Sequence, residues 1–145
     1  MPGWTTNLLT GIAQHIAAAG VGTWRATGVY QPTDTAIVIR TIPPSPDRLI
    51  TLAAYPVGSE VGIANLTTGV QIRLRAGRDP RDCDDLADAV FDLLDSAEHL
   101  QLGGVHDNQL YRQNYTSLGA DGSGRWERSE NYYVEAERPT PNRSN

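Results

Sequence analysis

The sequence has no lysine, one cysteine and one phenylalanine among its 145 residues. The single cysteine, Cys83, excludes an intrachain disulfide, so cysteine usage gives no support for secretion into an oxidising compartment. Acidic neighbours disfavour the thiolate of Cys83, which argues against a nucleophilic role. All 12 basic residues are arginine. A GC-rich genome produces this bias as readily as a need for forked hydrogen bonds, so it points to no function.

Long hydrophobic runs are also missing. No apolar stretch approaches the length of about 18 residues that indicates a membrane-spanning helix, and the first residues do not resemble a signal peptide. We therefore expect no membrane contact and a protein that is kept in the cytoplasm or in a particle assembled there. The net charge of −5 argues against general nucleic-acid binding, because phosphate neutralisation needs a basic surface.

The sequence lacks motifs for catalysis, cofactors and metals. The glycine-rich stretch from Gly119 to Gly124 precedes a strand pattern, whereas a phosphate-binding loop leads into a helix. No serine stands in a nucleophile elbow, and His15, His99 and His106 do not have the paired spacing of metal ligands. We therefore predict no catalytic, cofactor or metal site, and a protein that is not an enzyme.

Two helical patterns are present. Apolar residues at helical spacing predict a first helix that starts from an N-cap at Thr5 or Thr6 and stops at Gly20. Asp79 followed by Pro80 is typical of a second helix start, because the carboxylate caps the helix and proline suits its first position. Both helices should bury one apolar face.

Strand patterns fill most of the chain between the helices. Residues 23–25 fit a short strand, and β-branched and apolar runs predict strands over residues 36–42 and 48–57. The proline-rich segment 43–47 would join the last two as a hairpin. Residues 58–68 are expected to form a loop.

The next strand pattern, residues 70–75, alternates between apolar and polar side chains. Successive side chains of a strand point to opposite faces, so one face of this strand should be buried. Its polar row, which contains Arg73 and Arg75, is expected to face water or another molecule.

Two polar segments, residues 105–118 and 125–137, flank a turn-rich connection and predict a long β-hairpin. On the second segment Trp126, Arg128 and Tyr132 project to one side, and neither side has an ordinary core pattern. Arginine and aromatic side chains dominate protein interfaces. The hairpin is therefore either a partner-binding surface or a solvated hairpin with a few rings folded onto the core.

These patterns predict one α/β (α+β) domain over residues 1–138. We expect a mostly antiparallel or mixed β-sheet packed against two main helices, with a long C-terminal β-hairpin. Residues 139–145 contain no core-forming side chain and are expected to form a flexible tail.

The order of several motifs resembles the tail terminator family of long-tailed bacteriophages. The first helix pattern, then VQIRLR, then DDLADAVFDLL precede a glycine-rich signature, and the similarity extends from Leu8 to Val134. The signature residues are Leu118, Gly119, Asp121, Gly124, Arg125, Ser129, Asn131 and Tyr132.

The resemblance implies a structural virion protein, also called a minor capsid or tail completion protein, that has no catalytic activity. Such a protein forms a hexameric ring that caps the tail tube, stops its polymerisation and joins the tail to the head. The implied partners are other copies in a homo-hexamer, the major tail tube protein and the head-completion or stopper protein. The ring would lie at the head-tail junction of a virion assembled in the host cytoplasm, and DNA would pass through its lumen without specific binding.

Residues at the contacts of such a ring are expected among the exposed arginines and the interface-type residues of the hairpin. The candidates for ring or tube interfaces are Arg73, Arg75, Arg125, Trp126, Arg128 and Tyr132. Two other functions stay open at this point. One is a head-completion or stopper protein of the same connector, and the other is a small-ligand-binding α/β domain or enzyme.

Overall fold

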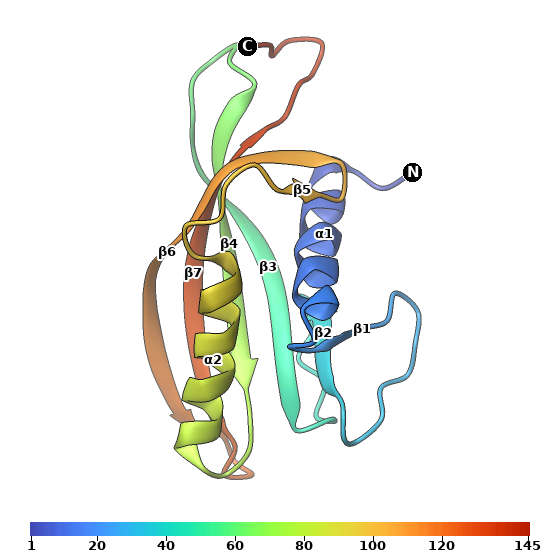
Figure 1. Cartoon of the computed structure of the whole chain (residues 1–145), viewed down its shortest axis with the longest axis vertical. Coiled ribbons are helices and arrows are strands. Elements are labelled where there is room, and N and C mark those ends of the chain that lie inside the picture. Colours follow the sequence, from blue (N-terminus) through green and yellow to red (C-terminus); the bar gives the residue numbers. More distant parts are fainter.

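The computed structural model describes residues 1–145 and contains two helices on one side of a curved sheet (Figure 1). The helices are α1 (Trp4–Ala18) and α2 (Pro80–Leu94). The strands are β1 (Thr23–Trp24), β2 (Thr35–Ile39), β3 (Arg48–Ser59), β4 (Asn65–Arg75), β5 (Gln101–Leu102), β6 (Val105–Ala120) and β7 (Trp126–Glu137). The seven strands follow the order β1-β2-β3-β4-β7-β6-β5. The predicted α+β class with a mixed sheet and two helices is confirmed.

Helix α1 begins two or three residues earlier than the sequence suggested. Its N-cap residue is Gly3, which has no side chain to cap the helix, so the prediction of Thr5 or Thr6 is wrong. A tertiary contact holds this end instead, because the indole nitrogen Nε1 of Trp4 donates to the backbone oxygen of Glu137 at 3.0 Å. The other end is as predicted, since Gly20 follows the helix with φ of 80°.

Helix α2 has the start that the sequence predicted. The Asp79 side chain accepts a hydrogen bond from the backbone N–H of Arg81 at 3.0 Å, and Pro80 occupies the first turn. The inner face of the helix packs on the sheet and includes Cys83, whose thiol has its pKa raised by burial to about 11. The thiol is therefore protonated at neutral pH and is not a nucleophile.

Strands β2 and β3 run parallel, which contradicts the predicted hairpin. The register pairs Thr35 with Arg48 and Ile39 with Leu52. The connection, residues 40–47, therefore returns along the length of β2 before β3 begins. A proline-rich segment can form a tight turn or a longer return path, so the sequence did not determine the strand polarity.

Strands β3 and β4 form a hairpin, and both strands are longer than predicted. β3 extends to Ser59 and β4 begins at Asn65, so most of the predicted loop 58–68 is strand. The C-terminal residues lie against the remaining loop, where the guanidinium of Arg143 donates to the backbone oxygen of Ile63 at 2.8 Å. The flexibility expected of residues 139–145 is a separate property and stays a prediction.

The long C-terminal hairpin is present as β6 and β7. Its glycine-rich connection is a turn organised by Asp121, whose carboxylate accepts hydrogen bonds from the backbone N–H groups of Ser123 and Arg125, both at 2.9 Å. Gly124 has φ of 81°, a conformation that glycine adopts without strain. The turn closes on itself, so its backbone donors are not directed at a ligand.

Candidate assembly surface

Strand β7 lies between β4 and β6 in the sheet. Its side chains point alternately to the two faces of the sheet. One row faces the helices and includes Tyr132, Val134 and Ala136, which are all buried in the core. The other row faces away from the helices, on the side of the sheet that no helix covers (Figure 1). We call this side the open face.

The helix-covered side of β7 contains a buried charge cluster. Glu130 is 0% exposed, and its Oε1 accepts hydrogen bonds from Arg112 Nη1 and from the Tyr132 hydroxyl, both at 3.2 Å. Its Oε2 lies 2.9 Å from Nε of Arg128, although these two atoms are not aligned as a hydrogen bond. Burial and the neighbouring carboxylate raise the pKa of Tyr132. The cluster is therefore a fixed part of the interior.

The same cluster attaches helix α2 to the hairpin. Arg128 donates to the carboxylate of Asp84 on α2 at 3.1 Å, and its guanidinium carbon lies 3.6 Å from the ring centroid of Tyr115. Arg112 stacks over Phe91 of α2 at 4.2 Å. These cation–π contacts and ion pairs link the helix to β6 and β7, in addition to the apolar packing of the inner face of α2.

Two other arginines hold the proline-rich segment 43–47 against the sheet. Arg75 donates to the backbone oxygens of Pro43, Pro46 and Asp47 at 2.7, 2.8 and 2.9 Å. Arg125 donates to the backbone oxygen of Pro44 at 2.6 Å and to Asp121 at 2.8 Å. Burial lowers the pKa of Arg75, with the nearby Arg125 adding to the effect.

The expectation that Arg75 faces water or another molecule is therefore wrong, and Arg125, Arg128 and Tyr132 are enclosed as well. Their exposed fractions are 3%, 9%, 6% and 1%. The segment 43–47 covers the first two and helix α2 covers the others, and both covering segments are distant in sequence. Arg73 and Trp126 keep part of their surface exposed. Whether any of the six lies at an interface stays a prediction.

The open face is a polar surface with fixed side chains. The hydroxyl of Tyr55 on β3 donates to Oδ1 of Asn131 on β7 at 3.1 Å, and Nδ2 of Asn131 donates to Oδ1 of Asn114 on β6 at 2.8 Å. In a neighbouring row Gln71 donates to Ser129 at 3.1 Å. These bonds connect β3, β4, β7 and β6 across the face, so its shape is set before any partner binds.

A glycine makes part of this arrangement possible. Gly69 pairs with Tyr55 across β3 and β4, and a Cβ added at Gly69 would lie 2.2 Å from the Tyr55 ring. The ring therefore lies over the glycine and reaches toward Asn131. Tyr111 and Tyr133 pack edge to face at 5.9 Å between centroids on the same side of the sheet. The sequence showed these tyrosines but gave no sign that Gly69 positions one of them.

Arg73 and Glu127 form the charged part of the open face. Nε of Arg73 donates to Oε1 of Glu127 at 3.0 Å, and the Arg73 side chain is 35% exposed. The open face thus offers several amides together with a guanidinium and several tyrosine rings, and the last two groups are enriched at protein interfaces.

The structure also gives information on metal-binding clusters and on membrane-spanning helices. No group of three or more His, Cys, Asp or Glu side chains is placed to hold a metal ion. Neither helix is long and apolar enough to cross a membrane.

Known proteins share both the sequence pattern and the fold. The sequence profile of a family described as "Bacteriophage tail terminator protein" matches residues 15–138. A chain in a structure described as "Virion of native gene transfer agent (GTA) particle" is similar with a TM-score of 0.65 at 16% identity. The similarity covers 92% of this chain and 96% of that one. No curated protein sequence matches the chain.

The fold is a small α+β domain with one helix-covered face and one polar face. The sequence match over residues 15–138 indicates a structural tail protein. The chain belongs to the bacteriophage tail terminator family. The predicted family resemblance is confirmed.

Proposed function

We propose that the protein forms a hexameric ring that caps the tail tube, stops its polymerisation and joins the tail to the head-completion or stopper protein. The family match over residues 15–138 carries this proposal. The ring lies at the head-tail junction of a virion assembled in the host cytoplasm, and DNA passes through its lumen. The role requires no catalysis.

The uncovered side of the sheet supports an assembly role. Tyr55, Asn131 and Asn114 are fixed by hydrogen bonds before binding, so a partner that docks here does not have to order them. We assign the open face to contacts within the assembly. A ring closes when each copy binds the next through two different surfaces related by a suitable rotation.

Two of the six candidate residues keep exposed surface that a partner could contact. Arg73 lies on the open face, and Trp126 lies on the helix-covered side beside the start of α2. The other four are enclosed by their own chain and act by fixing the shape of the subunit. We therefore retain Arg73 and Trp126 as contact residues of the ring or the tube.

The first test is the native mass of the purified protein by light scattering, together with negative-stain images of the same fractions. A ring with an open centre is expected, either alone or after addition of tail tubes from the same phage. Tubes that stay uncapped and continue to grow in the presence of the protein would contradict the proposed function.

A pair of matched variants tests the open face. Gln71 on β4 and Gln14 on α1 are both exposed, but only Gln71 lies on the open face. Gln71→Trp should prevent ring formation or tube capping because the bulky ring obstructs the surface, whereas Gln14→Trp should not. Equal assembly by the two variants would remove the open face from the interface.

A further inference from the structure

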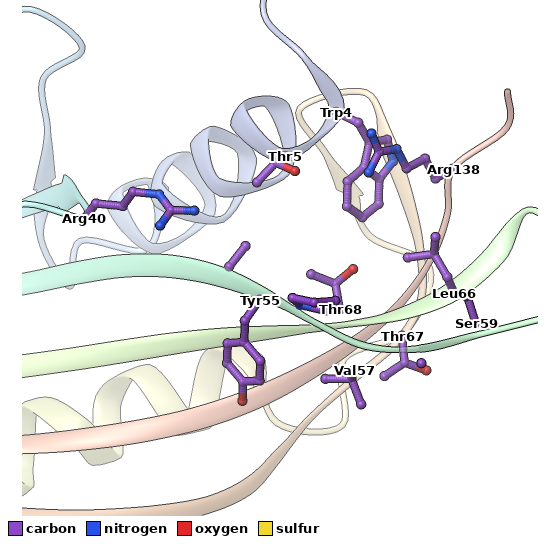
Figure 2. Close-up of a pocket in the computed structure, with 13 residues that line it drawn as sticks. Trp4, Thr5, Arg40, Tyr55, Val57, Ser59, Leu66, Thr67, Thr68 and Arg138 are labelled. Atoms are coloured by element: carbon purple, nitrogen blue, oxygen red, sulfur yellow. The ribbon is translucent and has the colours of Figure 1, made fainter.

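A pocket of about 460 Å³ opens beside the first turn of α1 (Figure 2). Its walls come from α1, the residue after β2, the second half of β3, and β4 with the residue after β7. Trp4, Thr68, Arg40 and Arg138 are among the lining residues. No aspartate or glutamate lines it, although the chain has a net charge of −5. The pocket is therefore a basic site on an acidic protein.

The arginines of this pocket have no acceptor in the chain. Nine of the 12 arginines form side-chain hydrogen bonds or ion pairs, which leaves Arg40, Arg78 and Arg138. Two of these three line the pocket. The guanidinium of Arg138 lies 5.2 Å from the ring centroid of Trp4, which places its charge beside the pocket wall. Figure 2 shows Arg40 and Arg138 at opposite ends of the site.

An unpaired strand edge runs between the two arginines. β2 ends at Ile39 and pairs with β3 only as far as Leu52, so the outer edge of β3 has no strand partner from Ala53 to Ser59. The backbone N–H of Arg40 donates to the backbone oxygen of Leu52 at 2.9 Å, which shows that Leu52 directs its backbone groups outward.

Alternate residues of a strand direct their backbone groups to the same side. Ala54, two residues after Leu52, therefore presents its N–H and C=O toward the pocket that it lines. Pro56, the next residue in this alternation, presents only its C=O, because proline has no N–H. An extended peptide that pairs with such an edge gains main-chain hydrogen bonds, and side-chain pockets provide its specificity.

We propose that this pocket binds an extended, acidic segment of another protein. The segment adds a short strand to the outer edge of β3 and directs carboxylates to Arg40 and Arg138, which can bind them in bidentate fashion. The first turn of α1 contains no acidic residue, so nothing on that side repels the incoming carboxylates. A nucleic-acid strand fits less well, because its phosphates would pair with the arginines but would leave the β3 edge unsatisfied. This inference does not depend on the hexameric ring.

The probe is a fluorescein-labelled eight-residue peptide of alternating threonine and glutamate, measured by fluorescence anisotropy. Arg40→Gln and Arg138→Gln should each weaken its binding by about fivefold or more, because each removes a charge-assisted contact. Arg78→Gln is the matched control, since Arg78 also lacks a partner but lies outside the pocket. It should bind like the unaltered protein.

Two further peptides separate charge from strand pairing. A peptide with glutamine in place of glutamate should lose most of the binding, and so should an acidic peptide N-methylated at alternate residues. Chemical shifts of labelled protein should change at Ala54 and Gly58 when the acidic peptide is added.

Several outcomes would overturn the proposal. They are an absence of saturable binding at millimolar peptide, equal binding of the glutamine peptide, or an equal loss in Arg78→Gln. Tighter binding of a single-stranded oligonucleotide, unaffected by the N-methylated peptide as competitor, would make the pocket a phosphate site instead. Self-association that requires Arg40 and Arg138 but excludes the peptide would assign the pocket to a second copy. None of these outcomes bears on whether the protein caps tail tubes.

Discussion

The two faces of strand β7 and its neighbours carry similar charged residues in different surroundings. On the helix-covered side Glu130 is fully enclosed beside Arg112 and Arg128. On the open face Glu127 pairs with Arg73 at 3.0 Å, and about a third of the Arg73 side chain stays in contact with solvent. Both sets tie strands together, but only the second can also contact a partner.

The difference shows that the covering segment, more than the residue type, decides what a polar side chain does. Arg128 is held under α2 by Asp84 and by the ring of Tyr115, so its charge is used within the subunit. Arg73 has no covering segment. A polar strand can therefore serve the fold with one row of side chains and assembly with the other.

The largest expected effect separates the two glutamates. Glu130→Ala should lower the free energy of unfolding by about 3–5 kcal/mol, because it leaves the buried Arg128 and the partly buried Arg112 without this carboxylate. Glu127→Ala should lower it by only about 1 kcal/mol, since Arg73 can turn to water. Urea unfolding followed by circular dichroism measures both. Equal losses would mean that the open face is as important for folding as the buried cluster.

The sequence predicted the parts of the fold that local patterns control. Alternation placed Val70, Ile72 and Leu74 on the buried face of β4, and all three are 0% exposed. The Asp79 cap and the long hairpin were also recognised, because their signals lie within a few residues of each other.

Features that depend on distant segments were not predicted. Arg75 occupies the row expected to face water, but residues 43–47 fold over it and supply three backbone acceptors. The parallel pairing of β2 with β3 depends on the path of the same segment. The enclosure of Tyr132 requires α2 to cross the hairpin, and no pattern around Tyr132 indicates which helix does so.

Asp107 is a third carboxylate to compare with Glu130 and Glu127, because it is buried and forms no ion pair with an arginine. Asp107 on β6 is 0% exposed, and neither of its oxygens accepts a side-chain or aligned backbone hydrogen bond. Burial raises its pKa from 3.8 to about 6, and this effect outweighs the opposing influence of nearby backbone N–H groups and of His106 and His99. The unfolded chain ionises this carboxyl at a lower pH than the folded chain does.

The charge on Asp107 should therefore destabilise the fold above the folded pKa. The contribution is absent below pH 3.8, grows as the pH rises to about 6, and then stays constant at roughly 3 kcal/mol. Asp107→Asn should remove this dependence and unfold at a higher temperature than the unaltered protein at pH 7. Asp88→Asn, at an exposed position of α2, is the control. Parallel pH profiles for Asp107→Asn and the unaltered protein would contradict the prediction.

A smaller effect is expected on the open face at Gly69. Gly69→Ala places a methyl group where the Tyr55 ring lies, which should cost about 1–3 kcal/mol in the free energy of unfolding. In a Tyr55→Ala background the same change should cost almost nothing, because the ring is gone. A thermodynamic cycle of the four proteins measures this coupling. Additive effects would show that the glycine does not position the tyrosine.

The smallest change in the free energy of unfolding is expected at Arg73, a residue for which we predict a clear effect on assembly. Arg73→Gln removes one ion pair whose arginine is partly exposed, and it should change the free energy of unfolding by less than about 1 kcal/mol. If the open face contacts another subunit or the tube, the same change should reduce ring formation or tube capping in negative-stain images. Arg81→Gln is the control, because the ion pair of Arg81 with Asp79 lies at the start of α2 and not on the open face.

The comparison of these two arginines tests the division of β4 and β7 into a folding side and an assembly side. Both variants should unfold like the unaltered protein, so a difference in assembly cannot come from stability. Normal assembly by Arg73→Gln would leave Trp126 as the only remaining contact candidate of the original six. Failure of both variants would mean that the start of α2 is also part of the assembled interface, and the division into two sides would then be too simple.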